Sequence, residues 1–103
     1  MKLIEKLSNM IEDEIDGAEC YAKTALIYKS EKPELARILY NLSMAELQHM
    51  EDLHALVVNV IEEYRSEHGE PPADMLAVYE YMHERHVNDA ANVRTLQTAY
   101  RQP

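Results

Sequence analysis

The sequence predicts an all-α protein made of an antiparallel hairpin of two long helices and a third helix. Three observations indicate this fold class. The 103 residues include only two glycines and four prolines, too few turn residues for an all-β fold. Most of these turn residues gather at two breaks. Between the breaks, apolar residues recur every three or four positions, which is the period of a helix.

The two breaks divide the chain into three helices. The first, Ser30-Glu31-Lys32-Pro33-Glu34, places a proline at a first-turn position, where its missing N–H group costs nothing. The second, Gly69-Glu70-Pro71-Pro72, joins a helix-ending glycine to paired prolines that cannot continue a helix. We therefore predict helices over roughly 3–30, 33–67 and 73–100, in a single domain over 1–103.

Charge and cysteine content limit the function classes. The formal charge of −9, from 19 acidic and 10 basic residues, repels phosphate backbones. Nucleic acid and anionic membranes are therefore not expected as partners, whereas soluble cations are. The single cysteine, Cys20, excludes an intramolecular disulfide and a cysteine-based metal cluster within one chain. Glu5 and Lys6 interrupt the apolar start and argue against a signal peptide, so we expect a cytoplasmic protein.

The second predicted helix carries the most informative pattern, a seam of residues spaced alternately four and three apart, as in a heptad repeat. Two polar residues interrupt this otherwise aliphatic seam near its middle, and they are three residues apart on one helix face. The seam consists of Leu35, Leu39, Leu42, Glu46, His49, Leu53, Leu56 and Val60.

A third polar residue is predicted to join this pair from the first helix. If the hairpin folds back about Lys32 and Pro33, Glu19 is level with Glu46, each about 20 Å from the turn at 1.5 Å of rise per residue. Glu19, Glu46 and His49 then converge within the hairpin.

Burying two carboxylates together is costly unless a cation neutralises them. No lysine or arginine is expected on the inward faces near this level, so a metal ion would supply the charge. Carboxylate oxygens with an imidazole nitrogen suit iron, manganese or zinc. Alternatively, Glu46 and His49 pair with each other, or with Arg94 and Asp16, and only set the helix register, as a buried polar seam residue can.

One Glu and one Glu-x-x-His are half of the ligand set of di-iron carboxylate bundles. A two-fold dimer would duplicate Glu19, Glu46 and His49 and form a four-helix bundle with four carboxylates and two imidazoles around its axis. The sequence therefore predicts a homo-oligomer, at least a dimer, with a shared metal site.

At this point the chain resembles the ferritin-like superfamily, particularly its rubrerythrin-like and encapsulated-ferritin branches, over roughly residues 5–60. Gly17-Ala18-Glu19-Cys20-Tyr21-Ala22 looks like a first-helix ligand segment, and Pro33-Glu34-Leu35 followed by Glu46-Leu47-Gln48-His49 looks like the second helix. The resemblance implies that Glu19, Glu46 and His49 bind iron. It also implies a ferroxidase-type oxidoreductase that oxidises ferrous iron with oxygen or peroxide.

The chain also departs from that family. Leu26 occupies the position seven residues after Glu19 where those proteins usually carry a tyrosine, which leaves Tyr21 or Tyr28 as substitutes. There is no four-cysteine domain, and the tail 99–103 does not look like a cage-targeting peptide.

Two further expectations concern the third helix and a rival function. A second Glu-x-x-His, Glu80 to His83, is expected to lie on a solvated face, and His86 to be a core or interface histidine. The rival function, from another class, is a dimeric helical interaction or adaptor protein without chemistry, in which Glu46 and His49 set register.

Overall fold

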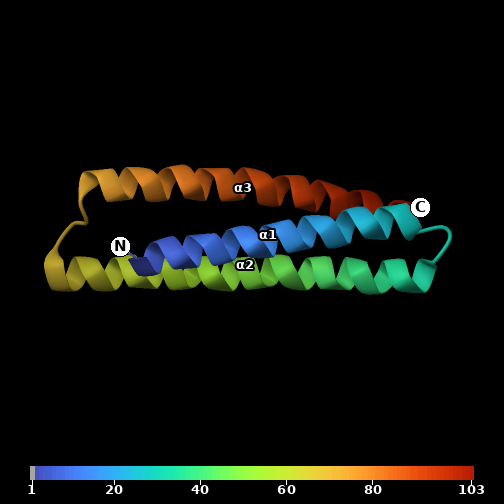
Figure 1. Ribbon diagram of the computed structural model, residues 1–103, viewed down its shortest axis with the longest axis horizontal. Coiled ribbons are helices and arrows are strands. Elements are labelled where there is room, and N and C mark those ends of the chain that lie inside the picture. Colours follow the sequence, from blue (N-terminus) through green and yellow to red (C-terminus); the bar gives the residue numbers. More distant parts are fainter. Residues whose placement is uncertain (1) are drawn as a thin grey trace.

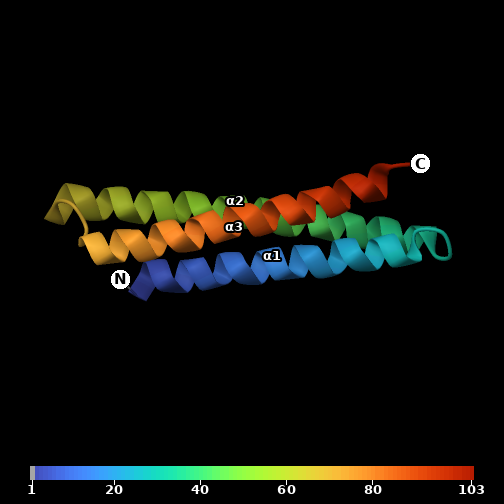
Figure 2. The same cartoon turned by 90° about the horizontal axis from the view of Figure 1, so that it is seen from above.

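The computed structural model describes residues 2–103 as three long helices and no strand: α1 (Lys2–Tyr28), α2 (Pro33–His68) and α3 (Ala73–Arg101). They form an elongated bundle of 56 × 18 × 18 Å in which each helix runs antiparallel to the one before it (Figure 1). Viewed from above, α3 lies over the groove between α1 and α2 (Figure 2). The predicted all-α class and the packing of α1 against α2 are confirmed.

The two connections explain why the helices end where they do. The Lys32 N–H donates to the Tyr28 carbonyl at 2.8 Å, and Pro33 opens α2 at its first position. At the other end of α2, Gly69 has a φ of 79°, a conformation that costs a glycine little, and its N–H donates to the Arg65 carbonyl at 3.0 Å.

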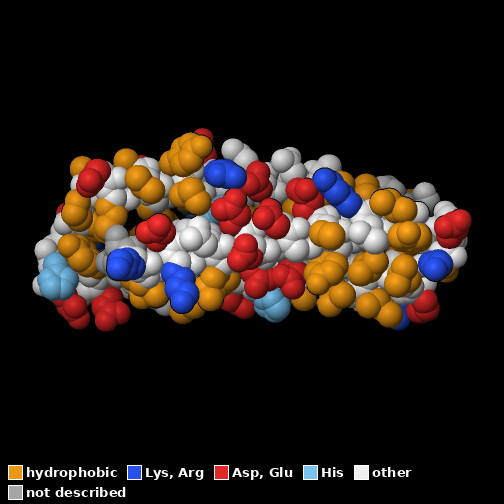
Figure 3. Space-filling view, in the orientation of Figure 1, with side chains coloured by type: hydrophobic (Ala, Val, Ile, Leu, Met, Phe, Trp, Pro, Cys, Tyr) orange, Lys and Arg blue, Asp and Glu red, His pale blue; other side chains and the backbone are white. Residues whose placement is uncertain are grey.

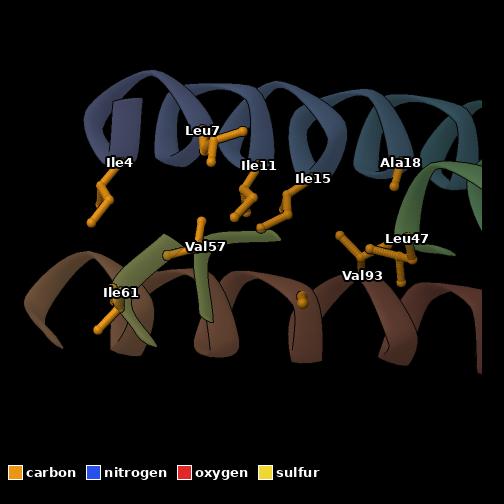
Figure 4. Packing of buried hydrophobic residues seen from close by; sticks show 10 residues of the cluster. Ile4, Leu7, Ile11, Ile15, Ala18, Leu47, Val57, Ile61 and Val93 are labelled. Carbon is orange, nitrogen blue, oxygen red and sulfur yellow. The ribbon is translucent and has the colours of Figure 1, made fainter. Parts of the chain in front are cut away.

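The core runs along the line where the three helices meet, and α1 contributes half of it (Figure 4). The cluster of buried apolar residues comprises Ile4, Leu7, Ile11, Ile15 and Ala18 of α1, Leu47, Val57 and Ile61 of α2, and Ala90 and Val93 of α3. The buried residues of α1 recur at three- and four-residue intervals, the spacing that keeps them on one helix face.

A buried hydrogen-bond chain fixes the register of all three helices. The Ser43 hydroxyl, fully buried on α2, donates to the Ala18 carbonyl of α1 at 2.7 Å. In turn it accepts a hydrogen bond from the Gln97 side-chain amide of α3 at 3.0 Å. Ala18 is therefore level with Ser43, whereas the predicted register would have placed it level with Leu47. The shift arises because the connection spans residues 29–32, so the turn is centred two residues before the predicted fold-back at Lys32 and Pro33. Each residue by which the turn centre moves shifts the level partner by two.

The heptad seam of α2 faces a different direction from the one expected. Leu35, Leu42 and Leu56 are 41–49% exposed, and the neighbouring residues Ser43 and Val57 are fully buried instead. Because α3 covers one side of the hairpin, the deepest positions of α2 are those that face both α1 and α3. Leu53 and Val60 of the seam are partly buried against the core cluster, whereas Leu42 and Leu56 are left at the uncovered side of the hairpin.

Candidate metal centre

Three potential metal ligands meet between α1 and α2. One ligand atom each from Glu14, Glu46 and His49 lies within 4.8 Å of the other two. Glu14 Oε2 is 3.4 Å from His49 Nδ1. Glu46 and His49 are one helical turn apart on α2, so they present their side chains to the same point, which Glu14 reaches from α1.

The neighbouring Glu14 carboxyl group changes the pKa of Glu46. A hydrogen bond to Glu14 raises the pKa of Glu46, burial and the Glu14 charge raise it further, and His49 opposes the shift. A group whose pKa is raised by folding stabilises the fold at low pH, and this contribution is lost as the pH rises through its folded pKa. A cation bound beside the ionised Glu46 carboxylate would oppose this upward shift of its pKa.

No lysine or arginine among the described residues forms an ion pair with Glu14 or Glu46. Glu14 Oε2 is buried, and it lies 3.4 Å from His49 Nδ1. Two carboxylates with a single imidazole match the oxygen and nitrogen ligands of iron, manganese and zinc sites, so the chemistry of the donor set fits such an ion. The carboxylate of Glu14 would supply one donor atom to such an ion.

Gly17 provides space for the Glu46 carboxylate. A Cβ atom added at Gly17 would lie 3.4 Å from Glu46 Oε2 and 3.7 Å from Glu46 Cδ. These distances are ordinary van der Waals contacts, so the site has room for an alanine Cβ but not for a longer side chain.

This gives a prediction for two substitutions at Gly17. Gly17→Ala should stabilise the metal-free chain by about 0.5–1 kcal/mol, because alanine restricts the unfolded chain and its Cβ atom makes only van der Waals contact. Gly17→Leu should lose that gain and weaken metal binding, because its longer side chain displaces the Glu46 carboxylate. Chemical denaturation and metal titration of both variants measure the two effects. Equal metal affinity in Gly17→Leu and wild type would show that Glu46 does not need this space.

The structure does not bring Glu19 to this cluster. Its carboxylate pairs with Lys23 on the same helix at 2.9 Å and is 42% exposed. Five residues separate Glu19 from Glu14, which is about 140° around the helix at 3.6 residues per turn. Of the predicted ligands, Glu46 and His49 lie together, and Glu14 takes the place from which Glu19 was expected to approach.

The spacing of one tyrosine in the sequence also points to Glu14. Tyr21 stands seven residues after Glu14, the same spacing at which the ferritin-like resemblance places a tyrosine after the first glutamate. Two helical turns bring Tyr21 close to the face of Glu14, and its side chain is half-buried there. Counted from Glu14 rather than from Glu19, the position seven residues on is therefore Tyr21 rather than Leu26.

The cluster lies on the side of the hairpin opposite α3, which we call the open face and define by Met10, Glu14, Leu42, Glu46, His49 and Leu56. On α1, Glu12 contacts Arg85 of α3 at 3.2 Å. Met10 and Glu14 each lie two residues from Glu12, or about 200° around the helix.

On α2, the residues of the open face likewise point away from the side that contacts α3. Tyr40 stacks on Tyr100 of α3, Glu51 pairs with Arg94, and His54 stacks on His83. Leu42, His49 and Leu56 each lie two residues from one of these contacts, so they point away from α3.

The open face is apolar on both sides of an acidic centre. Met10, Leu42 and Leu56 are 43, 41 and 49% exposed. A shallow groove beside the cluster is lined by Glu14 and His49 together with Asp13 and Asp52. In the space-filling view, acidic side chains crowd the middle of the visible surface, and hydrophobic groups gather on both sides of them (Figure 3).

The remaining candidates have other environments. Glu80 is exposed, and His83 of the second Glu-x-x-His stacks on His54 with 4.6 Å between ring centroids. His86 is buried, as expected, at 6% exposure. Cys20 is a free, exposed thiol. Over the part of the chain that the structure describes, no helix is both long and apolar enough to cross a membrane.

Comparison of the chain with models of known families, with curated proteins and with solved structures finds no match.

Proposed function

We propose that this protein binds iron at a carboxylate–histidine centre formed by Glu14, Glu46 and His49 and completed by the same residues of a second copy. The observation that carries the proposal is the convergence of these three side chains within 4.8 Å. They meet where no lysine or arginine pairs with either carboxylate in the described chain. The resemblance to ferritin-like proteins supports iron over manganese or zinc, and it supports oxidation of ferrous iron as the activity.

One chain supplies only half of a two-metal site. Three protein donors leave positions open on a metal ion, whereas four carboxylates and two imidazoles form the ligand set of a di-iron bundle. The cluster lies on the face that α3 leaves uncovered, so a two-fold axis through this face would bring two clusters together. The exposed leucines on both sides of the cluster supply apolar surface for the contact.

The residues have separable roles in this centre. Glu14, Glu46 and His49 would hold the metal, and each ferrous ion bound there would give up one electron to oxygen or peroxide, the oxidant. Tyr21 lies two helical turns from Glu14, close to the same face of α1, and its hydroxyl could orient a carboxylate or water beside the metal. Gly17 keeps the space that lets the Glu46 carboxylate approach α1.

The rival function, a helical interaction protein without chemistry, also has an observation in its favour. The open face exposes leucines that suit a partner helix, and a polar pair in a seam can select register without a metal. The two functions differ for Glu46→Leu. An interaction protein should tolerate this change or gain stability, because apolar replacement of partly buried ionic groups is often neutral or favourable, and it should bind no metal in either form.

The test is elemental analysis after ferrous iron is added anaerobically and the protein is exposed to air. Wild type should retain about one iron per chain, the ratio of a two-metal site shared by two chains. Glu46→Ala and Glu14→Ala should each lose most of it. Oxygen consumption on iron addition then measures oxidation, which should fall in the same variants.

Glu19→Ala is the matched control, because it removes a glutamate from the same helix whose carboxylate pairs with Lys23. It should retain iron. If Glu19→Ala lost iron and Glu14→Ala retained it, Glu19 would be the metal ligand, as the family resemblance implies. That result would overturn the role of Glu14. No iron above background in wild type would reject the metal function and favour the interaction protein.

A further inference from the structure

Three of the five histidines of the chain gather around one cavity that is open to solvent on one side, away from the metal centre. His54 of α2 and His83 and His86 of α3 line a cavity of about 230 Å³ between the three helices. Ile11, Met50 and Ala90 supply apolar walls. None of these histidines takes part in the cluster on the open face, so the metal function does not account for the cavity.

One wall of the cavity is a stack of aromatic rings. The His54 and His83 rings lie 4.6 Å apart between centroids with 15° between their planes, and Tyr79 continues the stack at 5.9 Å from His83. Such a wall presents a π surface, on which a planar ring packs in an offset or edge-on arrangement.

A buried polar atom without a partner also borders the cavity. His86 is 6% exposed, and its Nε2 atom is buried with no hydrogen bond among the described residues. Burial lowers the pKa of His86, against the smaller opposing effects of Glu12 and Asp89, so its imidazole is neutral at pH 7. A buried polar group without a partner is costly, and native structures rarely keep one. A hydroxyl group can satisfy Nε2 in either tautomer, because it both donates and accepts.

The size of the cavity limits what can fill it. An apolar protein cavity of about 150 Å³ holds one benzene ring, so a cavity of about 230 Å³ accommodates one ring or two fused rings. A surface groove lined by Ile4, Val78 and Met82 shares Ser8 and Tyr79 with the cavity, which gives a route from solvent. Figure 1 shows α3 spread away from α1 at this end of the bundle.

From these observations we infer that the cavity is a binding site for a planar aromatic molecule of one or two rings that carries a hydroxyl group. The ring packs on the wall of Tyr79, His83 and His54, and the hydroxyl hydrogen-bonds to His86 Nε2. The aromatic wall favours a planar molecule, and the cavity volume limits that molecule to one or two rings. The Nε2 atom of His86, which has no hydrogen-bond partner among the described residues, favours a hydroxyl group.

The test is titration of the full chain with naphthol, with naphthalene as the probe that lacks the hydroxyl. The chain has no tryptophan, so naphthol fluorescence can be followed directly, and the imidazole NMR signals of His54, His83 and His86 report where it binds. Naphthol should bind with a dissociation constant below a millimolar, and shift the His86 signal. His86→Leu keeps the apolar volume but removes the nitrogen, and should weaken naphthol binding about three- to tenfold, without changing naphthalene binding.

His68→Leu is the control, since this histidine is exposed on the last turn of α2 and does not line the cavity. It should bind naphthol like wild type. Equal naphthol affinity in His86→Leu and wild type would overturn the assignment of the hydroxyl to Nε2. Absence of naphthol binding up to its solubility limit would overturn the site as a whole. The proposal would also be overturned if zinc shifted the NMR signals of all three histidines at a concentration at which naphthol shifted none of them. The cavity would then be a cation site.

Discussion

Replacing both Leu42 and Leu56 by glutamate is expected to keep the protein monomeric and to remove most of the proposed iron binding. Both side chains lie on the open face on either side of the cluster, and they are 41 and 49% exposed, so the single chain should still fold. In a two-fold dimer the substitutions would place four added negative charges in the contact between copies. Like charges placed together in an interface oppose association strongly.

The metal itself should control this association. Two apposed copies bring four carboxylates together, which repel one another until cations lie between them. Light scattering after size exclusion should therefore show wild type shifting toward the dimer when ferrous iron is added without oxygen, and the Leu42→Glu, Leu56→Glu variant remaining a monomer. Iron per chain in the same samples should fall together with the dimer.

Ile27→Glu and Val78→Glu are matched controls, because these side chains are 71 and 64% exposed but lie outside the open face. Ile27 is two residues from the fully buried Ala25, so it points away from the hairpin, and Val78 belongs to α3. Both variants should dimerise and bind iron like wild type. If the double glutamate variant dimerises as well as these controls, the second copy does not use the open face.

Ile15→Ala should destabilise the fold more than any change on the surface, by about 2–5 kcal/mol. Ile15 is only 2% exposed and belongs to the core cluster where the three helices meet (Figure 4). Truncation removes buried apolar surface and leaves a cavity that the surrounding long helices cannot close fully. Since small domains are stable by only about 5–15 kcal/mol, thermal and urea unfolding should show a large loss.

Ile27→Ala is the control for this change, since it makes the same truncation on the same helix at a residue that is 71% exposed. Its effect should stay within about 0.5 kcal/mol. A loss of less than about 1 kcal/mol in Ile15→Ala would contradict the core described above, because a cavity of that size could not remain in it.

The sequence by itself determined the helices. A proline at the start of α2, a glycine and paired prolines after it, and apolar residues at helical spacing predicted three helices whose observed bounds differ from the predicted ones by at most two residues. These signals are local, since each depends on backbone preferences and side chains within one or two turns. The same local pattern identified Glu46 and His49 as a pair on one face.

Tertiary structure decided which residues meet that pair. A hairpin register depends on where the first helix stops and on the bonds that align it, here the chain from Ala18 through Ser43 to Gln97. A turn centred two residues earlier moved the level partner of each position by four residues, or about one helical turn, which brought Glu14 rather than Glu19 to Glu46 and His49.

The orientation of the helices was also a tertiary outcome. The third helix covers one side of the hairpin and leaves the heptad seam of α2 on the other, with Leu42 and Leu56 exposed beside the cluster. No local pattern specifies which side α3 will cover, because each helix can bury its apolar face only against neighbours that are distant in sequence. The sequence therefore determined the helices and the Glu46–His49 pair. The meeting of Glu14 with that pair, the open face and the cavity around His86 exist only once the three helices have packed.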